Sequence, residues 1–283
     1  DVSNNSGVED GSIDHPYNTI DEALSIAHNG DNISIAAGNY PEDSLLVRTN
    51  VDISGESQSS TIVEGSFIFS GGLDVIPLSI SDLCCKNVIL SDSSILKTRM
   101  DILDCRLQTF TNDISVFDTT ASMHFSGNTV NDSIHLLVAL CKGDIDINNC
   151  SPSGQLSLSF ASIREGRISI NDNVVGGDMK ILSYLKKDTL FVSNNEIEAC
   201  LEITSGSSFP EIITNNTIGS DIVLSSKSSS GIQFRNNEVE DGSLYATFTA
   251  LSNSDITNNH FQNGGIDFTA VSADVSIDGN TIN

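Results

Sequence analysis

His124 stands between two carboxylates, Asp101 and Asp146, at intervals of 23 and 22 residues. A histidine flanked by carboxylates is the residue set of a general acid/base pair or of a metal site. The two intervals match the period of a repeat along the chain, which predicts that the three side chains share one outward column on neighbouring strands. A solvated polar face without chemistry is the alternative interpretation.

Lys180 and Glu202 form a second candidate pair, because an interval of 22 residues again predicts neighbouring strands, about 5 Å apart. An ordinary cross-strand ion pair is the alternative here. Near the start of the chain, Glu9, Asp10 and Asp14 are candidates for a divalent ion, although they lack the spacing of an EF-hand loop. No residue pattern in the sequence requires a cofactor, and Ca²⁺ is a candidate ligand of these carboxylates.

A repeat of about 22 residues must position these side chains. Each repeat contains one residue, here called its marker, that is an asparagine or a cysteine three positions after an apolar residue. The markers recur at intervals of 21 to 23 residues. Asparagine suits a sharp bend because it tolerates the left-handed backbone region, and stacked asparagines can hydrogen-bond to one another along an axis. The predicted interior ladder consists of Cys105, Asn128, Cys150, Asn173, Asn195, Asn216, Asn237, Asn259 and Asn280.

Apolar and polar residues alternate on both sides of each marker, as in Met123/Phe125 before Asn128 and Ile134/Leu136 after it. A period of two is typical of short strands with one buried face, and no helical period appears between them. Strands that recur once per coil bury their apolar face against the neighbouring coils. The predicted fold class is all-β: a right-handed parallel β-helix with an N-terminal capping α-helix.

A single β-helix domain is predicted over residues 1–283. Residues 1–35 form the N-terminal cap, in which the capping box Thr19-Ile-Asp-Glu22 opens a helix over about 19–29 and Asn29-Gly30 ends it. Residues 36–100 form the first, irregular coils, and residues 101–283 form the regular Asn-ladder coils. Because the last residues stop within a repeat, we expect the β-helix to continue, or to be capped, beyond residue 283 in a longer protein.

The balance of charged residues limits the classes of molecule that the protein could bind. Lys and Arg total 13 against 38 Asp and Glu, a formal charge of -25. Such a surface disfavours nucleic acid as a partner, and no apolar run is long enough to insert directly into a membrane.

The six cysteines show no C-x-x-C spacing, and Cys105 and Cys150 are two coils apart, so buried thiols are favoured over disulfides. We expect an extracellular, cell-surface or virion location.

Two apolar residues occupy outward positions, Phe191 and Ile212, with Val223 predicted across the coil. An outward apolar patch is typical of a surface covered by a partner. The candidates are other subunits of a surface or virion assembly, a homotrimer included. A loop packed over the coil is the alternative.

The opening third of the chain carries a family resemblance. The segments that carry it are Asp10-Gly-Ser-Ile-Asp-His-Pro-Tyr-Asn-Thr-Ile-Asp-Glu-Ala-Leu24, Asn29-Gly-Asp-Asn-Ile-Ser-Ile35, Ala37-Gly-Asn-Tyr-Pro-Glu42, Val51-Asp-Ile-Ser-Gly-Glu-Ser57 and Thr61-Ile-Val-Glu-Gly65. They resemble the pectin-lyase-like β-helix superfamily, and the later Asn-Asn coils look like its generic repeats. The resemblance implies the fold, but this superfamily includes lyases, hydrolases, esterases, tailspikes and adhesins.

The function expected from these observations is that of a non-catalytic surface β-helix, acting as a fibre, spike or adhesin, with glycans as candidate ligands. The Asn-Thr-Asp, Asp-Asp, Gly-His-Gly and Arg-Ile-Lys segments usual in polygalacturonase-like members are missing. The alternative is a carbohydrate-active enzyme, a polysaccharide lyase or a glycoside hydrolase. Its divergent site would lie near His124 or on the Lys180/Glu202 face.

Overall fold

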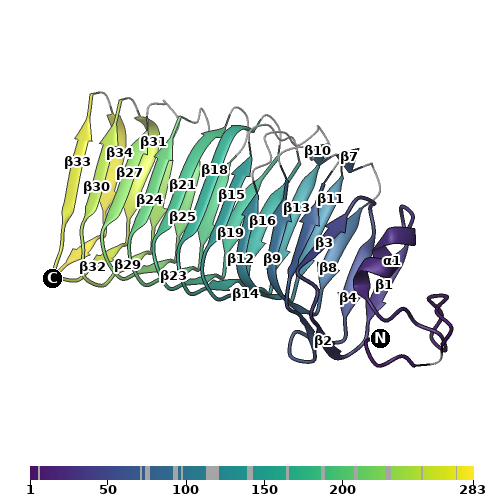
Figure 1. Cartoon of the computed structure of the whole chain (residues 1–283). Coiled ribbons are helices and arrows are strands. Elements are labelled where there is room, and N and C mark those ends of the chain that lie inside the picture. Colours follow the sequence, from purple (N-terminus) through teal and green to yellow (C-terminus); the bar gives the residue numbers. More distant parts are fainter. Residues whose placement is uncertain are drawn as a thin grey trace.

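A computed structural model describes most of the chain as one column of stacked strands (Figure 1). The described residues are 1–5, 7–70, 72–73, 77–91, 95–96, 98–112, 121–138, 143–163, 166–185, 189–206, 210–226, 231–249, 251–271 and 273–283. Cys141 lies outside them. All strand pairs described are parallel, and the fold is the predicted right-handed parallel β-helix.

Sheet A, as we name it, is a continuous stack of parallel strands. Over the described residues it has 12 strands in sequence order, and each is hydrogen-bonded to the strand one coil away. The strands are β1 (Asn32–Ile35), β4 (Asp52–Gly55), β8 (Leu78–Ser81), β11 (Arg99–Leu103), β13 (Ser122–Ser126), β16 (Ile145–Asn148), β19 (Ile168–Asn171), β22 (Leu190–Ser193), β25 (Glu211–Thr214), β28 (Ile232–Arg235), β31 (Leu251–Thr257) and β34 (Ala273–Asp278).

Sheet B faces sheet A across the core. Its main path comprises β2 (Gly38–Tyr40), β5 (Thr61–Val63), β9 (Cys84–Leu90), β12 (Arg106–Asn112), β15 (Ile134–Val138), β18 (Leu156–Ile163), β21 (Met179–Leu185), β24 (Leu201–Ser205), β27 (Ile222–Ser226), β30 (Leu244–Phe248) and β33 (Ile266–Ala270). Four strands join it from the side: β3 (Ser44–Val47), β6 (Ser66–Phe69), β14 (Thr129–Val130) and β17 (Ser151–Pro152).

Two smaller sheets complete the coils. Sheet C, also named here, contains β20 (Val174–Val175), β23 (Glu196–Ile197), β26 (Thr217–Ile218), β29 (Glu238–Val239), β32 (His260–Phe261) and β35 (Thr281–Ile282), and β7 (Gly72–Leu73) pairs with β10 (Ile95–Leu96). In the later coils the chain therefore runs from sheet A through sheet C to sheet B. This order confirms the repeat of about 22 residues, because each coil supplies one strand to each sheet.

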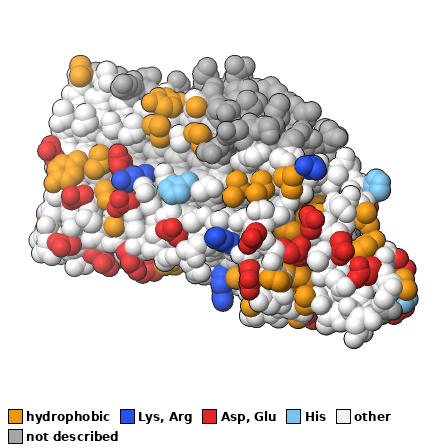
Figure 2. Space-filling view, in the orientation of Figure 1, with side chains coloured by type: hydrophobic (Ala, Val, Ile, Leu, Met, Phe, Trp, Pro, Cys, Tyr) orange, Lys and Arg blue, Asp and Glu red, His pale blue; other side chains and the backbone are white. Residues whose placement is uncertain are grey.

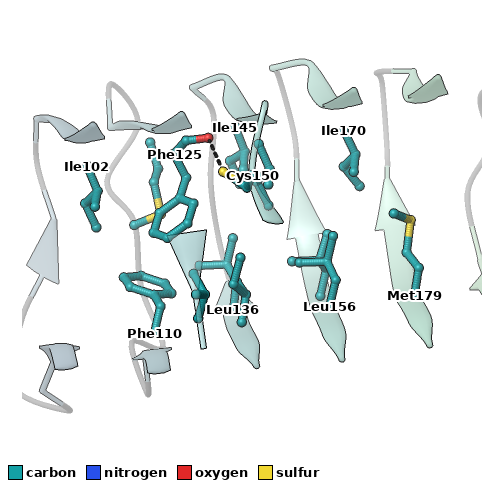
Figure 3. Packing of buried hydrophobic residues seen from close by; sticks show 14 of the residues in the cluster. Ile102, Phe110, Phe125, Leu136, Ile145, Cys150, Leu156, Ile170 and Met179 are labelled. Atoms are coloured by element: carbon teal, nitrogen blue, oxygen red, sulfur yellow. Dashed lines mark hydrogen bonds between the residues drawn. The ribbon is translucent and has the colours of Figure 1, made fainter. Parts of the chain in front are cut away.

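The core consists of inward columns from sheets A and B. Ile102, Phe125, Ile147 and Ile170 are register partners on sheet A and are at most 2 % exposed. Figure 3 shows that Ile102, Phe125 and Ile170 point toward side chains of sheet B. Among these is Phe110, whose ring centroid lies 5.0 Å from that of Phe125. Each such buried side chain contributes about 1.5–3 kcal/mol of transfer free energy.

The ladder residues lie inside the coil at the turn that follows each sheet A strand. Asn173 Nδ2 donates to Asn195 Oδ1 at 2.9 Å, and the pattern repeats through Asn216, Asn237 and Asn259 to Asn280. Each Oδ1 also accepts the backbone N–H of the preceding marker. The amides therefore satisfy main-chain groups that the bend removes from strand pairing.

Thiols replace the amide at two rungs. Cys150 Sγ donates to the carbonyl oxygens of Phe125 at 3.4 Å (Figure 3) and Asn148 at 3.2 Å. Cys105 Sγ likewise donates to the carbonyl oxygens of Ile80 and Leu103. All cysteines in the described residues are free thiols.

The left-handed backbone position was predicted wrongly. It belongs not to the marker but to the residue before it, as in Asp104, Asn149 and Asn194, whose φ values are 50°, 51° and 56°. Gly127 and Gly279 occupy the same position in their coils. The residue before the marker therefore makes the bend, with its side chain pointing outward. The marker itself points inward and makes the interior hydrogen bonds.

The helix α1 (Ile20–Ile26) lies at the N-terminal end of the column (Figure 1). Thr19 and Glu22 form the predicted capping box. Glu42 adds a second cap, accepting the N–H of Ile20 at 2.8 Å and of Asp21 at 2.9 Å. The helix is shorter than the predicted 19–29, because Ala27 already has extended geometry, with ψ 141°.

Candidate functional site

Sheet A brings the predicted residues Asp101, His124 and Asp146 together. They are register partners on β11, β13 and β16 and alternate with the inward core residues. His124 Nδ1 lies 3.2 Å from Asp146 Oδ2, and their side chains are 28 % and 12 % exposed. The imidazole is thus held by one carboxylate while its edge stays accessible to solvent.

Two arginines that the sequence analysis missed complete this cluster. Arg99 Nε lies 2.7 Å from Asp101 Oδ1, and Arg167 Nη2 lies 3.3 Å from Asp146 Oδ1. The hydrogen bond to Asp101 raises the pKa of Arg99. Arg99 is two residues before Asp101 on β11, and Arg167, directly before β19, is two residues before Ser169, so the period-two alternation already predicts the same outward face for both. We call these five residues the His124 cluster.

The His124 cluster has the parts of an acid/base site. A carboxylate facing Nδ1 favours the tautomer with the proton on that nitrogen, which leaves Nε2 as the basic nitrogen. Each arginine uses one nitrogen for its aspartate, and in the described residues the other side-chain N–H groups of Arg99 and Arg167 have no protein acceptor. A planar guanidinium binds a ligand carboxylate through two parallel hydrogen bonds.

Lys180 and Glu202 lie on sheet B, so they cannot join the His124 cluster. They are register partners on β21 and β24, with Lys180 Nζ 3.9 Å from Glu202 Oε2. Lys180 lies nearer to Asp178 Oδ2, at 3.3 Å. All three side chains are at least one third exposed, and exposed pairs of this kind contribute little to stability. Figure 2, a view of one face of the molecule, shows how widely acidic side chains are spread over it.

The predicted apolar patch is divided between two sheets. Phe191 and Ile212 are register partners on sheet A and are partly buried. Val223 is on β27 of sheet B, between Glu202 and Tyr245. The three residues therefore do not form one surface, because successive sheets of a coil face different directions.

The acidic residues near the start are not brought together as a metal site. Glu9 accepts a hydrogen bond from Asn18. Asp10 accepts from the backbone of Ser12, and the hydrogen bonds from Ser12 lower the pKa of Asp10. Across the described residues, Glu9, Asp10 and Asp14 included, no group of three or more His, Cys, Asp or Glu side chains is arranged to hold a metal ion.

Two hollows adjoin the N-terminal cap. One of about 320 Å³ lies between α1 and β1 and is lined by Asp10, Tyr17 and Ile20 among others. The other lies beside it, along β1 and the start of the next coil. No residue of the His124 cluster lines either hollow. In the described residues, no helix combines the length and apolar character needed to cross a bilayer.

No family model matches the sequence, and no curated protein matches it. A polysaccharide lyase of the PL6 family from Pseudopedobacter saltans is similar in structure, with 12 % identity, 93 % of this chain and 90 % of that chain covered, and a TM-score of 0.36. A mannuronic acid-specific family 6 polysaccharide lyase from the human gut microbiota has 11 % identity, 91 % and 79 % coverage, and a TM-score of 0.36. A PL6 family alginate lyase has 13 % identity, 93 % and 50 % coverage, and a TM-score of 0.29.

Proposed function

We propose that the protein is a carbohydrate-active β-helix that cleaves a uronate-containing polysaccharide at the His124 cluster. One observation carries the proposal: a histidine beside a carboxylate, His124 and Asp146, has an arginine on each side, Arg99 and Arg167. A base next to carboxylate-binding groups is what β-elimination from a uronate requires.

The reaction follows from the groups available. His124 Nε2 takes the proton at C5, next to the uronate carboxylate, and an arginine side chain stabilises the negative charge that this carboxylate gains. The C4–O bond then breaks, a C4=C5 double bond forms, and the departing oxygen takes a proton from solvent. Asp146 positions the imidazole and stabilises its protonated form, so Asp146 is a positioning residue.

The arrangement of strands suits a long ligand. The cluster crosses neighbouring coils of sheet A, whose strands are spaced by about 4.8 Å. Arg99 and Asp101 are on β11, His124 and Asp146 are on the next two strands, and Arg167 directly precedes β19. A polysaccharide lying across these strands would meet side chains from one coil after another.

Incubation of the protein with a panel of uronate-containing and neutral polysaccharides, with and without Ca²⁺, tests the proposal. We expect ultraviolet-absorbing unsaturated ends from a uronate polymer only, and their loss in His124→Ala. His135→Ala is the matched control, because His135 is an outward histidine of sheet B. Tight binding without cleavage would instead favour the non-catalytic, adhesin-like function, and equal activity of both variants would exclude His124 as the base.

A further inference from the structure

The interior of the β-helix becomes polar over three consecutive coils. One inward column of sheet B reads Val138, Phe160, Ser183, Ser205, Ser226 and Phe248 in register. The three serines are 0 %, 3 % and 6 % exposed. Apolar residues bound them on both sides along the axis, so the serines form an enclosed polar section of an otherwise apolar column.

Glu211 is buried against this section. It starts β25, in the inward column of sheet A between Leu190 and Ile232, and is 3 % exposed. Its carboxyl group interacts with the hydroxyl of Ser205, whose Oγ lies 3.1 Å from Ser226 Oγ. Within the described residues, Glu211 Oε1 and Ser183 Oγ are buried and have no hydrogen-bond partner.

A buried carboxylate without a positive partner is costly. Desolvation raises the pKa of Glu211 to about 7, against the opposing hydrogen bond from Ser205, and no charged group of the described chain contributes to the shift. Above that pH the carboxyl group is ionised inside the protein, and a bound cation would compensate its charge. Two buried, unpaired oxygens in one section are also the usual mark of a bound water or ion.

We propose that this section encloses a site for one monovalent cation, Na⁺ or K⁺, bound by Glu211 and the surrounding serine hydroxyls in competition with a proton. All of the donors are oxygens, which hard cations prefer. The section has a single carboxylate, and no cluster of three or more acidic, His or Cys side chains occurs in the described residues. One negative charge matches one monovalent cation and leaves a divalent ion uncompensated.

Thermal unfolding of the full chain in sodium, potassium and choline chloride at equal ionic strength tests this site. Choline is too large to enter. About two pH units above the pKa of Glu211, we expect sodium or potassium to raise the Tm above its value in choline, by an amount that grows with the logarithm of the cation concentration. About two units below it, the proton occupies the site and the difference between salts disappears.

Variants separate this site from surface effects of salt. Glu211→Gln should abolish the difference between salts, whereas Glu240→Gln, which removes a carboxylate from an exposed position, should keep it. Ser183→Ala should shift the dependence to higher cation concentration. Equal Tm values in the three salts, or a difference that survives Glu211→Gln, would overturn the proposal.

A direct measurement does not depend on the variants folding. Crystals of the unchanged protein grown in rubidium or thallium chloride should give an anomalous peak beside Glu211 Oε1. Rubidium and thallium replace K⁺, so ordered water without such a peak, in crystals kept about two pH units above the pKa of Glu211, would overturn a K⁺ site. A Tm that sodium does not raise above its value in choline would overturn an Na⁺ site.

Discussion

Asn195 Nδ2 donates to Asn216 Oδ1 and to the carbonyl oxygen of Ile170, at 2.9 Å in each case. The Oδ1 of Asn195 accepts the backbone N–H of Asn173 at 3.1 Å. One side chain that is 2 % exposed therefore satisfies the backbone groups of the neighbouring coil at the bend. The ladder is a structural device that ties each coil to the next, and it is separate from the His124 cluster.

Asn195→Ala should lower the free energy of unfolding by about 2–4 kcal/mol, because it leaves the N–H of Asn173 and the carbonyl of Ile170 buried without partners. Urea denaturation measures the change. Asn194→Gly is the matched control, since the neighbouring residue has φ 56° and glycine occupies this position at Gly127 and Gly279. We expect the control to change stability by less than about 1 kcal/mol. Equal losses in the two variants would contradict a stabilising role of the ladder amide.

Thiol reactivity should follow burial. Desolvation raises the pKa of Cys105 and of Cys150 to about 12, so neither forms the reactive thiolate at neutral pH. Cys84 and Cys200 are only partly buried. A thiol reagent applied to the native protein, with peptide mapping to score each cysteine, should label these two first. Early labelling of Cys105 or Cys150 would show that the ladder opens readily.

Removing the second cap of α1 should loosen the N-terminal end. Glu42→Ala leaves the N–H groups of Ile20 and Asp21 without their acceptor and should cost about 1 kcal/mol. Glu42→Gln keeps one acceptor oxygen and should cost less. Hydrogen exchange of the helix amides measures both, and an unchanged exchange rate in Glu42→Ala would show that the capping box suffices.

Stability in choline buffer should fall as the pH rises through the titration of Glu211. Its pKa is about 7 in the folded protein and 4.5 in the reference state. Between these values the folded state binds more protons, so the free energy of unfolding decreases with pH; the contribution is fully present below about pH 4.5 and lost above about pH 7. The expected loss is about 3 kcal/mol. Glu211→Gln should remove this slope, and an identical slope in the variant would assign it to other groups.

Variants of the His124 cluster should divide binding from chemistry, if the proposed function holds. Asp146→Asn keeps the side-chain shape and removes the charge that supports the imidazolium, so kcat should fall by about 10²-fold or more. Arg167→Ala should mainly raise KM for a uronate polymer. Arg235→Ala is the matched control, because Arg235 pairs with Asp255 on the same face several coils away. A control that raises KM equally would indicate a general loss of positive charge.

The repeat of about 22 residues, and with it the β-helix fold, follows from the sequence alone. Evenly spaced markers from Cys105 to Asn280 and apolar alternation predict the strands, their parallel stacking and their inward faces, because each coil packs only on its neighbours and the information is local. The same period predicts that Asp101, His124 and Asp146 are adjacent. Thr19 and Glu22 likewise locate the start of the capping helix.

The orientation of the sheets, the pairing of long side chains and the burial of Glu211 depend on the tertiary structure. The spacing does not give the angle between sheets, and this angle separates Val223 from Phe191 and Ile212. Nor does alternation say how a long arginine bends, so the pairing of Arg167 with Asp146 appeared only in three dimensions. Glu211 falls in an inward column by sequence, but only the packed interior shows that its carboxyl group stays buried beside Ser205, because burial depends on every coil around it.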